Sequence, residues 1–324
     1  MRMKSTVVAI AGVVTVVLAI ASFLKSQPSA QNSDSRPPEA VRVVEPDNNE
    51  PFDAELAGRI RALSNGAGGT VGVAIIHVET GRIVTLEGAK QLPLYSVFKL
   101  PLAVSVLKSV EENKLALEKK IRVTPEDVAP GSQFNLDLWR KPVERSVREL
   151  LEVSIVRSDN TSSDKLLGLV GGPAGVTQRM RSMGFANIDI HSSTREFAAH
   201  RANPNTGSAE DLARLLAQLQ KGEILASPQL EILLGFMRRA LMGEKRLRGN
   251  LPKDTPVADK TGTGEAASNT NDVGLITLPA GKGHLAMAVL ISGSRLTAEA
   301  QEKLIAELAR TAYDAHVSPP VTRY

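Results

Sequence analysis

The order of strand and helix patterns along the chain limits its possible folds more than any other feature. Apolar runs of strand length occur at 71–78 and 83–86, and again at 256–261, 273–278 and 285–291. Short connections typical of turns join the first two runs and the last two, so we expect a β-hairpin near each end of the folded region. The two ends are then expected to share one antiparallel sheet.

Helical patterns account for most of the remainder. Apolar residues recur at helical spacing in 53–64 and 297–315, and we expect these two terminal helices to lie on a face of the sheet. The chain between the hairpins predicts helices at 146–156, 159–170, 173–183, 209–219 and 227–241. Residues 185–207 show no clear period, so we expect a long loop there that is either functional or disordered.

These patterns predict a mixed α/β chain of the α+β type. Its folded region spans 52–316, with a sheet part formed by 52–92 and 243–316 and an all-helical subdomain formed by 93–242. The functional site is expected in a cleft between the two parts. Residues 317–324 are expected to form a tail.

The N-terminus predicts an exported protein. Arg2 and Lys4 precede an apolar stretch from Val7 to Leu24, and Ala19-Ile20-Ala21 resembles a small-residue cleavage site. We therefore expect 1–25 to be either a cleaved signal peptide or a retained membrane anchor, and 26–51, rich in Pro, Ser and acidic residues, to be a linker. Both alternatives place the folded region in the periplasm or outside the cell.

Composition excludes several functions. Lys and Arg number 39 against 35 Asp and Glu in 324 residues, and the two signs are interleaved, so no nucleic-acid-binding stripe is expected. The chain has no cysteine, which excludes disulfides, thiol catalysis and thiolate metal sites. Its five histidines show no metal-ligand spacing. A structural role, or none, therefore fits the histidines better than a metal site.

The first candidate catalytic motif is Ser96-x-x-Lys99. Pro93 marks the start of a helix just before it. Because residues three apart share a helix face, Lys99 is expected beside the Ser96 hydroxyl, where a neutral amine could take its proton. The same spacing also occurs at Ser22/Lys25, Ser105/Lys108 and Ser162/Lys165, which we interpret as chance matches in apolar or helical segments.

Two further motifs follow in order. Ser158-Asp159-Asn160 lies at a junction between two expected helices, and Lys260-Thr261-Gly262 lies on an expected strand. Either motif alone is ordinary. Together with Ser96 and Lys99 they form an ordered set on a helix start, an inter-helix loop and a strand.

At this point the sequence resembles the class A β-lactamases, penicillin-recognising serine hydrolases. The resemblance covers about 52–316 and includes "SVRELLEVSIVRSDNTSSDKLLGLVGG" at 146–172 and "NDVGLITLPAGKGHLAMAVLIS" at 271–292. It implies a β-lactamase/transpeptidase-like fold, a monomer, and hydrolysis of a small β-lactam through an acyl-enzyme on Ser96. No metal, organic cofactor or nucleic acid is implied.

The resemblance also assigns roles within this motif set. Lys99 would be the base for attack, aided by a nearby Lys260 that lowers its pKa by like-charge repulsion. Ser158 would pass a proton to the leaving nitrogen, and Asn160 would bind the side-chain amide of the substrate. The remaining substrate-binding residues would be Lys260, Thr261, Gly262 and Thr263. The backbone N–H groups of Ser96 and Thr263 would form the oxyanion hole.

Three positions need separate interpretation. Class A enzymes use a loop glutamate for deacylation, usually followed four residues later by asparagine, but here Glu196 is followed by His200. Glu196 is therefore either the deacylation base in a remodelled loop or a surface carboxylate. Tyr95 is bulkier than expected before the nucleophile. Arg295 could bind a carboxylate, although a surface role fits it better.

Two rival functions use the same acylation residues. One is a peptidase acting on D-alanyl-D-alanine stems of peptidoglycan, and the other is a membrane-anchored sensor that β-lactams acylate without turnover. The three functions differ in the fate of the acyl-enzyme, and hence in the segment around Glu196.

Overall fold

The computed structural model describes residues 43–44, 50–200, 204–264 and 268–318. These all belong to one compact unit, Glu39–Tyr324. The other unit, Met1–Pro38, lies outside the described residues, and so do the expected signal peptide or anchor and most of the expected linker. In the ranges that are described, no helix combines the length and apolar character that crossing a membrane requires.

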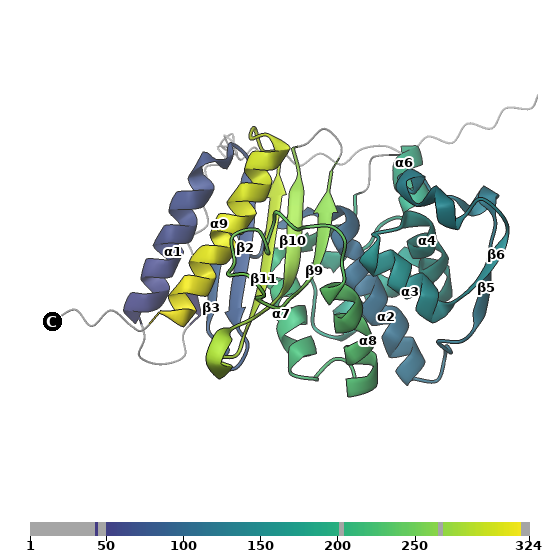
Figure 1. Ribbon diagram of the computed structural model, residues 1–324, viewed down its shortest axis with the longest axis horizontal. Helices are drawn as coiled ribbons and strands as arrows, with labels where there is room; N and C mark the ends of the chain where they lie inside the picture. The colour runs from purple at the N-terminus through teal and green to yellow at the C-terminus, as the bar shows by residue number, and fades with distance from the viewer. Residues whose placement is uncertain (1–42, 45–49, 201–203, 265–267, 319–324) are drawn as a thin grey trace, which may run out of the picture. The chain divides into compact units, whose positions relative to one another are not determined.

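A six-stranded antiparallel sheet lies at the centre of this unit, with the strand order β1-β3-β2-β11-β10-β9 (Figure 1). Its strands are β1 (Val43–Val44), β2 (Thr70–His77), β3 (Ile83–Leu86), β9 (Val257–Thr263), β10 (Thr270–Thr277) and β11 (His284–Ser292). Strands from the two ends of the chain meet where β2 pairs with β11. The predicted shared sheet is therefore confirmed, and β9 forms one of its edges.

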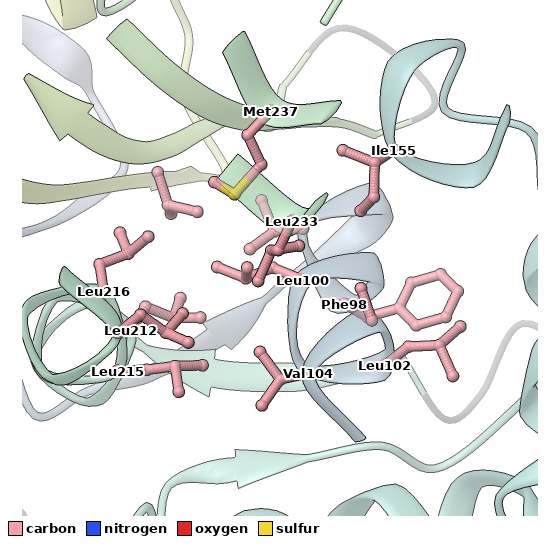
Figure 2. Close-up of a cluster of buried hydrophobic side chains, with 14 of the residues drawn as sticks. Phe98, Leu100, Leu102, Val104, Ile155, Leu212, Leu215, Leu216, Leu233 and Met237 are labelled. Carbon is pink, nitrogen blue, oxygen red and sulfur yellow. The ribbon is translucent and has the colours of Figure 1, made fainter. Parts of the chain in front are cut away.

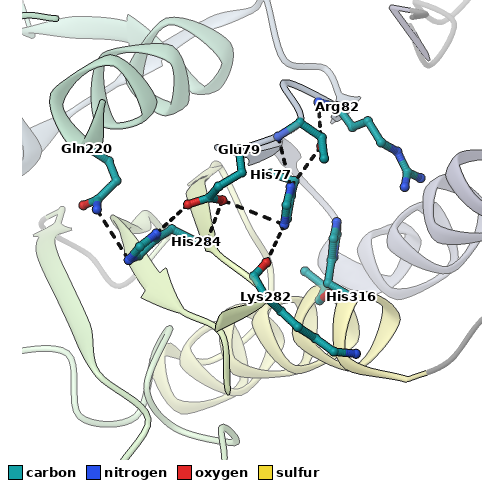
Figure 3. Close-up of polar contacts among 9 residues, drawn as sticks. His77, Glu79, Arg82, Gln220, Lys282, His284 and His316 are labelled. Carbon is teal, nitrogen blue, oxygen red and sulfur yellow. Dashed lines mark hydrogen bonds and ion pairs between the residues drawn. The ribbon is translucent and has the colours of Figure 1, made fainter. Parts of the chain in front are cut away.

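Two terminal helices cover one face of the sheet. They are α1 (Glu50–Ser64) and α9 (Ala298–Val317), which lie side by side in Figure 1. Their apolar residues join alternate residues of β2 and β11, and Ile276 of β10, in a continuous core. At the far end of α9, the ring of His316 stacks on that of His77, with the ring centroids 5.3 Å apart (Figure 3).

Helices from the middle of the chain cover the other face. α7 (Ala209–Gln220) packs on β2, β10 and β11, and α2 (Lys99–Glu111) and α8 (Ser227–Arg238) join it in a second core (Figure 2). Both faces of the central strands are thus buried, which explains why β11 reads as a nearly continuous apolar run. Because α2 is almost entirely buried here, the segment that precedes it is held firmly in place.

Further helices extend the middle part beyond the sheet. These are α3 (Val147–Val156), α4 (Asn160–Leu169), α5 (Gly172–Ser182) and α6 (Thr194–His200). The part 93–242 is not all-helical as expected, because it also contains short strands. β5 (Lys120–Val123) pairs with β6 (Val143–Ser146), and β8 (Thr206–Ser208) pairs with β7 (Ile188–Asp189) and with β4 (Gln91–Pro93), which lies at the boundary of the two parts.

The expectation that 185–207 is a loop without secondary structure was wrong. It contains β7, α6 and β8. α6 has only seven residues and no apolar period, and it depends on contacts with α4. Asp164 of α4 accepts hydrogen bonds from Thr194 N (2.8 Å) and Arg195 N (3.1 Å), two N–H groups of the first turn of α6.

Candidate active site

The candidate nucleophile lies in a tight turn before α2. A 3₁₀ turn, Tyr95–Phe98, leads directly into α2, so Ser96 is in the first turn, where backbone N–H groups lack intrahelical acceptors. Tyr95 has a left-handed backbone with φ 48°, an unusual conformation for an aromatic residue and one that often marks functional strain. Leu94 fixes the turn, because its N–H donates to Asn205 O at 2.8 Å.

The edge strand β9 lies directly against this turn at Gly262. A Cβ atom there would overlap with the carbonyl oxygen of Leu94 and would lie 3.2 Å from Val97 Cγ2. Asn271 of β10 supports the same contact, donating through Nδ2 to Pro93 O at 2.8 Å. Glycine at 262 therefore allows the strand backbone to approach the nucleophile turn closely.

Lys99 is fully buried, and its Nζ lies at the centre of the site. It is 2.6 Å from Ser158 O, 2.7 Å from Asn160 Oδ1, 3.1 Å from Ser96 Oγ and 3.3 Å from Ser158 Oγ. The predicted proximity of Lys99 to Ser96 is therefore present. A neutral amine has two N–H donors, and the carbonyl oxygens of Ser158 and Asn160 can only accept. The lone pair is then left for a hydroxyl, with Ser96 the nearer one.

The electrostatic surroundings favour that neutral amine. Burial is the largest cause that lowers the pKa of Lys99 well below the value of a free lysine, and repulsion from Lys260 lowers it further. The nearby carboxylates of Asp159 and Asp164 oppose the shift. The direction agrees with the predicted effect of Lys260, but burial is the larger cause.

The three side chains of the loop 158–160 make different contacts. Ser158 has φ 53°, and its Oγ lies 3.0 Å from Lys260 Nζ as well as 3.3 Å from Lys99 Nζ. Asp159 points away into the protein, where it is fully buried and caps α4 by accepting from Ser162 N at 2.7 Å. Asn160 Nδ2 donates to Pro130 O at 2.6 Å, so both ends of its amide are engaged.

Lys260 approaches the same loop from β9. It is 1% exposed, and its Nζ donates to Thr261 O at 2.9 Å and to Ser158 Oγ at 3.0 Å. Burial lowers the pKa of Lys260 to about 8, although the carboxylates of Asp272 and Asp259 act in the opposite direction. Thr261 lies on the other face of the strand, where a Cβ on Gly243 would be 2.6 Å from its Cγ2.

Thr263 follows at the exposed end of β9. The N–H of Gly264, one residue later, donates to Asn269 O at 3.0 Å on the β10 side. Because successive N–H groups of a strand point to opposite sides, the Thr263 N–H points to the unpaired edge of β9 and is not used in pairing with β10. This orientation suits the predicted oxyanion hole.

Glu196 lies further out, in the first turn of α6. Its carboxylate accepts from Ser193 N at 2.8 Å and Ser193 Oγ at 2.9 Å, and its own N–H donates to Ser193 Oγ at 3.2 Å. This is a reciprocal capping box, and the Glu196 residue is exposed. Asp164, which anchors α6, is close enough to Lys99 for each to affect the pKa of the other.

Comparison with known proteins identifies the family. A sequence model described as the β-lactamase enzyme family matches residues 55–316. The chain belongs to the β-lactamase enzyme family. Extended-spectrum β-lactamase PER-1 of Pseudomonas aeruginosa is 32% identical over 271 residues, covering 80% of this chain and 86% of the relative.

Solved structures agree with this membership of the β-lactamase family. A β-lactamase from Chitinophaga pinensis is 33% identical, with a TM-score of 0.77, over 81% of this chain and 99% of that chain. TLA-3 extended-spectrum β-lactamase is 30% identical, with a TM-score of 0.78, and the match covers 82% of this chain and 100% of that chain. The predicted resemblance, fold class and activity, that of a serine β-lactamase, are thereby confirmed.

One residue of this β-lactamase site was missed from sequence. Arg246 is 6% exposed and donates to Gly262 O at 2.9 Å and to Thr263 Oγ1 at 2.8 Å. It precedes β9 in a segment without a recognisable motif, so only the fold brings it to the site. Arg295, the arginine considered from sequence, is exposed and packs instead against Gly68.

Two of the competing Ser-x-x-Lys motifs of this β-lactamase are accounted for by local bonding. Ser105 Oγ donates to Pro101 O at 2.8 Å, and Ser162 Oγ donates to Asp159 Oδ1 at 2.7 Å. The third, Ser22/Lys25, lies outside the described residues.

Proposed function

We propose that this chain hydrolyses β-lactams through an acyl-enzyme on Ser96, with Lys99 as the base for acylation. The observation that carries the proposal is the hydrogen bonding of the buried Lys99 amine. Its two N–H groups are taken by Ser158 O and Asn160 Oδ1, which supports a lone pair directed at Ser96 Oγ, 3.1 Å away.

The proton then has a path to the leaving group. Attack of Ser96 Oγ on the lactam carbonyl forms the C–O bond and transfers the hydroxyl proton to Lys99. Ser158 Oγ, 3.3 Å from Lys99 Nζ, accepts that proton and gives its own to the lactam nitrogen as the C–N bond breaks. Lys260 holds Ser158 in place from the other side.

Substrate binding is assigned to the β9 edge. Lys260 supplies positive charge for the carboxylate of the substrate, and Thr263, at the exposed end of β9, supplies a hydroxyl. Arg246 adds charge and orients Thr263. The N–H groups of Ser96 and Thr263 stabilise the developing oxyanion, while Gly262 allows the close approach of strand and turn on which their spacing depends. Asn160 is assigned to the side-chain amide of the substrate.

Deacylation is assigned to Glu196 as general base for water. The position of α6 supports this assignment. Asp164 of α4 binds the first turn of α6, which contains Glu196, and Asp164 is close enough to Lys99 to affect its pKa. We further propose that the enzyme is a monomer with a catalytic domain at 52–316. The basic start and apolar run of 1–25 support export to the periplasm or cell exterior, by a cleaved signal or a retained anchor.

The test mixes purified protein with a chromogenic cephalosporin and follows both hydrolysis and intact mass. We expect steady turnover and a transient adduct on Ser96, lost in Ser96→Ala. Ser105→Ala is the matched control, because it removes a serine from a competing motif in α2 and should leave turnover unchanged. A single stoichiometric burst with a lasting adduct would instead support the sensor function.

A further inference from the structure

Tyr95, the bulky residue before the nucleophile, contacts the end of β9 at one specific place. A Cβ atom on Gly264 would lie 2.5 Å from Tyr95 Cζ and 2.8 Å from Tyr95 Oη. No real Cβ atom tolerates such distances, so the phenol ring lies directly over Gly264. The same Cβ atom on Gly264 would also lie 2.9 Å from Asn269 Cβ.

This contact joins the two peptide units assigned to the oxyanion hole. The Ser96 N–H belongs to the peptide unit between Tyr95 and Ser96, so the backbone of Tyr95 sets its direction. Gly264 directly follows Thr263, the source of the second N–H. The Tyr95 ring therefore connects the residue before one donor to the residue after the other.

The backbone conformation of Tyr95 indicates why the contact with Gly264 is needed. Its φ of 48° is a conformation that a non-glycine residue keeps only when its surroundings enforce it. The neighbouring contact at Gly262 brings the main chain of β9 against Leu94 O but uses no side chain from the turn except Val97. Tyr95 supplies a large, rigid side chain from the turn, and this side chain meets the chain at Gly264, two residues beyond Gly262.

We propose that Tyr95 is a positioning residue for the oxyanion hole, its ring acting against Gly264 to fix the spacing of the Ser96 and Thr263 N–H donors. The inference rests on the proposed acylation of Ser96. The rigid ring provides this function, so phenylalanine should replace tyrosine at 95, whereas a small side chain should not. Glycine at 264 leaves room for the ring, and a side chain there would displace either the ring or the end of β9.

The test is a double-mutant cycle with Tyr95→Ala, Tyr95→Phe, Gly264→Ala and the Tyr95→Ala/Gly264→Ala pair. Two readouts are taken: the acylation rate, and the carbonyl stretch of the acyl-enzyme by rapid-mixing infrared spectroscopy. Hydrogen bonds from the oxyanion hole weaken the carbonyl bond and lower its frequency, so the stretch reports the donors directly and a merely structural role would not move it.

Tyr95→Ala should slow acylation ~10- to 100-fold, below the ~100- to 1000-fold typical of losing a donor entirely, and shift the stretch to higher frequency. Tyr95→Phe should keep the parent frequency and most of the rate. Gly264→Ala should be much more damaging in the parent than in the Tyr95→Ala background. Parent-like acylation and an unshifted stretch in Tyr95→Ala would overturn the proposal, as would equal Gly264→Ala penalties in both backgrounds.

A failure of the proposed function gives a different result. In that case the parent protein forms no adduct on Ser96 with any β-lactam, which overturns the assigned role of Tyr95 as well. The Tyr95–Gly264 contact can still be measured independently by the thermal unfolding midpoints of the same proteins. If the changes in unfolding midpoint of Tyr95→Ala and Gly264→Ala do not add in the double variant, the two residues are in contact, although the contact then positions no oxyanion hole.

Discussion

Lys99 Nζ lies 3.1 Å from Ser96 Oγ while its two shortest contacts, at 2.6 and 2.7 Å, go to oxygens that can only accept hydrogen bonds. This difference between acceptor-only oxygens and a hydroxyl determines which protonation state of the amine can act as a base. The neutral form fills both acceptors and keeps a lone pair for the serine, whereas the ammonium form would have no lone pair and could not take the proton. Full burial and the charge of Lys260 favour the neutral form.

Lys99→Met should therefore slow acylation of Ser96 by ~100- to 10,000-fold, the range expected for loss of a positioned general base. Methionine keeps the length and apolar stem of the side chain, so the fold should survive. Stopped-flow measurement of adduct formation checks the rate. Lys165→Met is the matched control: it removes a lysine from a competing motif whose ion pair with Asp127 lies at the surface, and it should leave acylation nearly unchanged.

The pH dependence of the reaction should identify Lys260. Its pKa is lowered to about 8 by burial, so above that pH it loses the charge that we propose attracts the substrate carboxylate. We expect kcat/KM to fall as pH rises through about 8, mainly through a higher KM. Lys260→Arg should move this alkaline limb upward, because arginine stays charged. An alkaline limb at the same pH in Lys260→Arg would assign it to another group.

Gly262→Ala should damage the site through packing alone. The added methyl would overlap with Leu94 O, so β9 must shift from the nucleophile turn, with a loss of stability of ~1–3 kcal/mol from overpacking. Activity should fall further than stability, because the N–H groups proposed as oxyanion donors, those of Ser96 and Thr263, lie on opposite sides of this contact. Gly235→Ala on α8, where the methyl meets nothing within 4 Å, is the control and should not lower either quantity.

These contacts show what could be predicted from the sequence. Ser96-x-x-Lys99, Ser158-Asp159-Asn160 and Lys260-Thr261-Gly262 are local motifs, and each was predicted on the correct kind of element. The sheet was predictable because its strands are apolar runs separated by turns. The individual roles assigned to these residues stay predictions, since the geometry supports them but measures no reaction.

The remainder depends on contacts between distant segments. Arg246 reaches Gly262 and Thr263 only because the fold brings its segment under β9. Gly262 was assigned to substrate binding, yet its closest neighbour is Leu94 O, which no spacing rule could indicate. Helix α6 is different, because Ser193-x-x-Glu196 is a capping-box signature that was present in the sequence and overlooked.

Stability should fall in acid because of His316. Burial is the largest cause that lowers its pKa below the usual value, and repulsion from His77, on which its ring stacks (Figure 3), and from Arg82 adds to this, while Ala312 O and Asp53 oppose it. A folded pKa below the unfolded one means that the unfolded chain binds more protons. The contribution of His316 to the free energy of unfolding is therefore fully present above the usual histidine pKa and declines as pH falls below it.

His316→Phe should reduce that decline, since phenylalanine can still stack on His77 but does not titrate. The measurement compares unfolding midpoints at neutral and mildly acidic pH in parent and variant. His191→Gln, which changes an exposed histidine, is the control and should retain the pH dependence of the parent. Equal dependence in His316→Phe and the parent would show that other groups, such as the Glu79–His284 pair, cause it.

Glu196→Gln gives the clearest test of deacylation, because it separates two possible roles of one side chain. A capping box accepts Gln as well as Glu, so the variant should keep the hydrogen bonds to Ser193 and the start of α6. It cannot act as a general base. If Glu196 activates the deacylating water, Glu196→Gln should acylate at the parent rate and release product at least ~100-fold more slowly, giving a long-lived adduct by intact mass.

Ser193→Ala is the reciprocal variant, because it weakens the cap of α6 and leaves the Glu196 carboxylate in place. If the carboxylate acts chemically, adducts should persist in Glu196→Gln and turn over in Ser193→Ala. Long-lived adducts in Ser193→Ala with parent-like release in Glu196→Gln would mean that the cap matters and the base lies elsewhere. Parent-like release in both would make Glu196 a surface carboxylate, and His200 would become the next residue to replace.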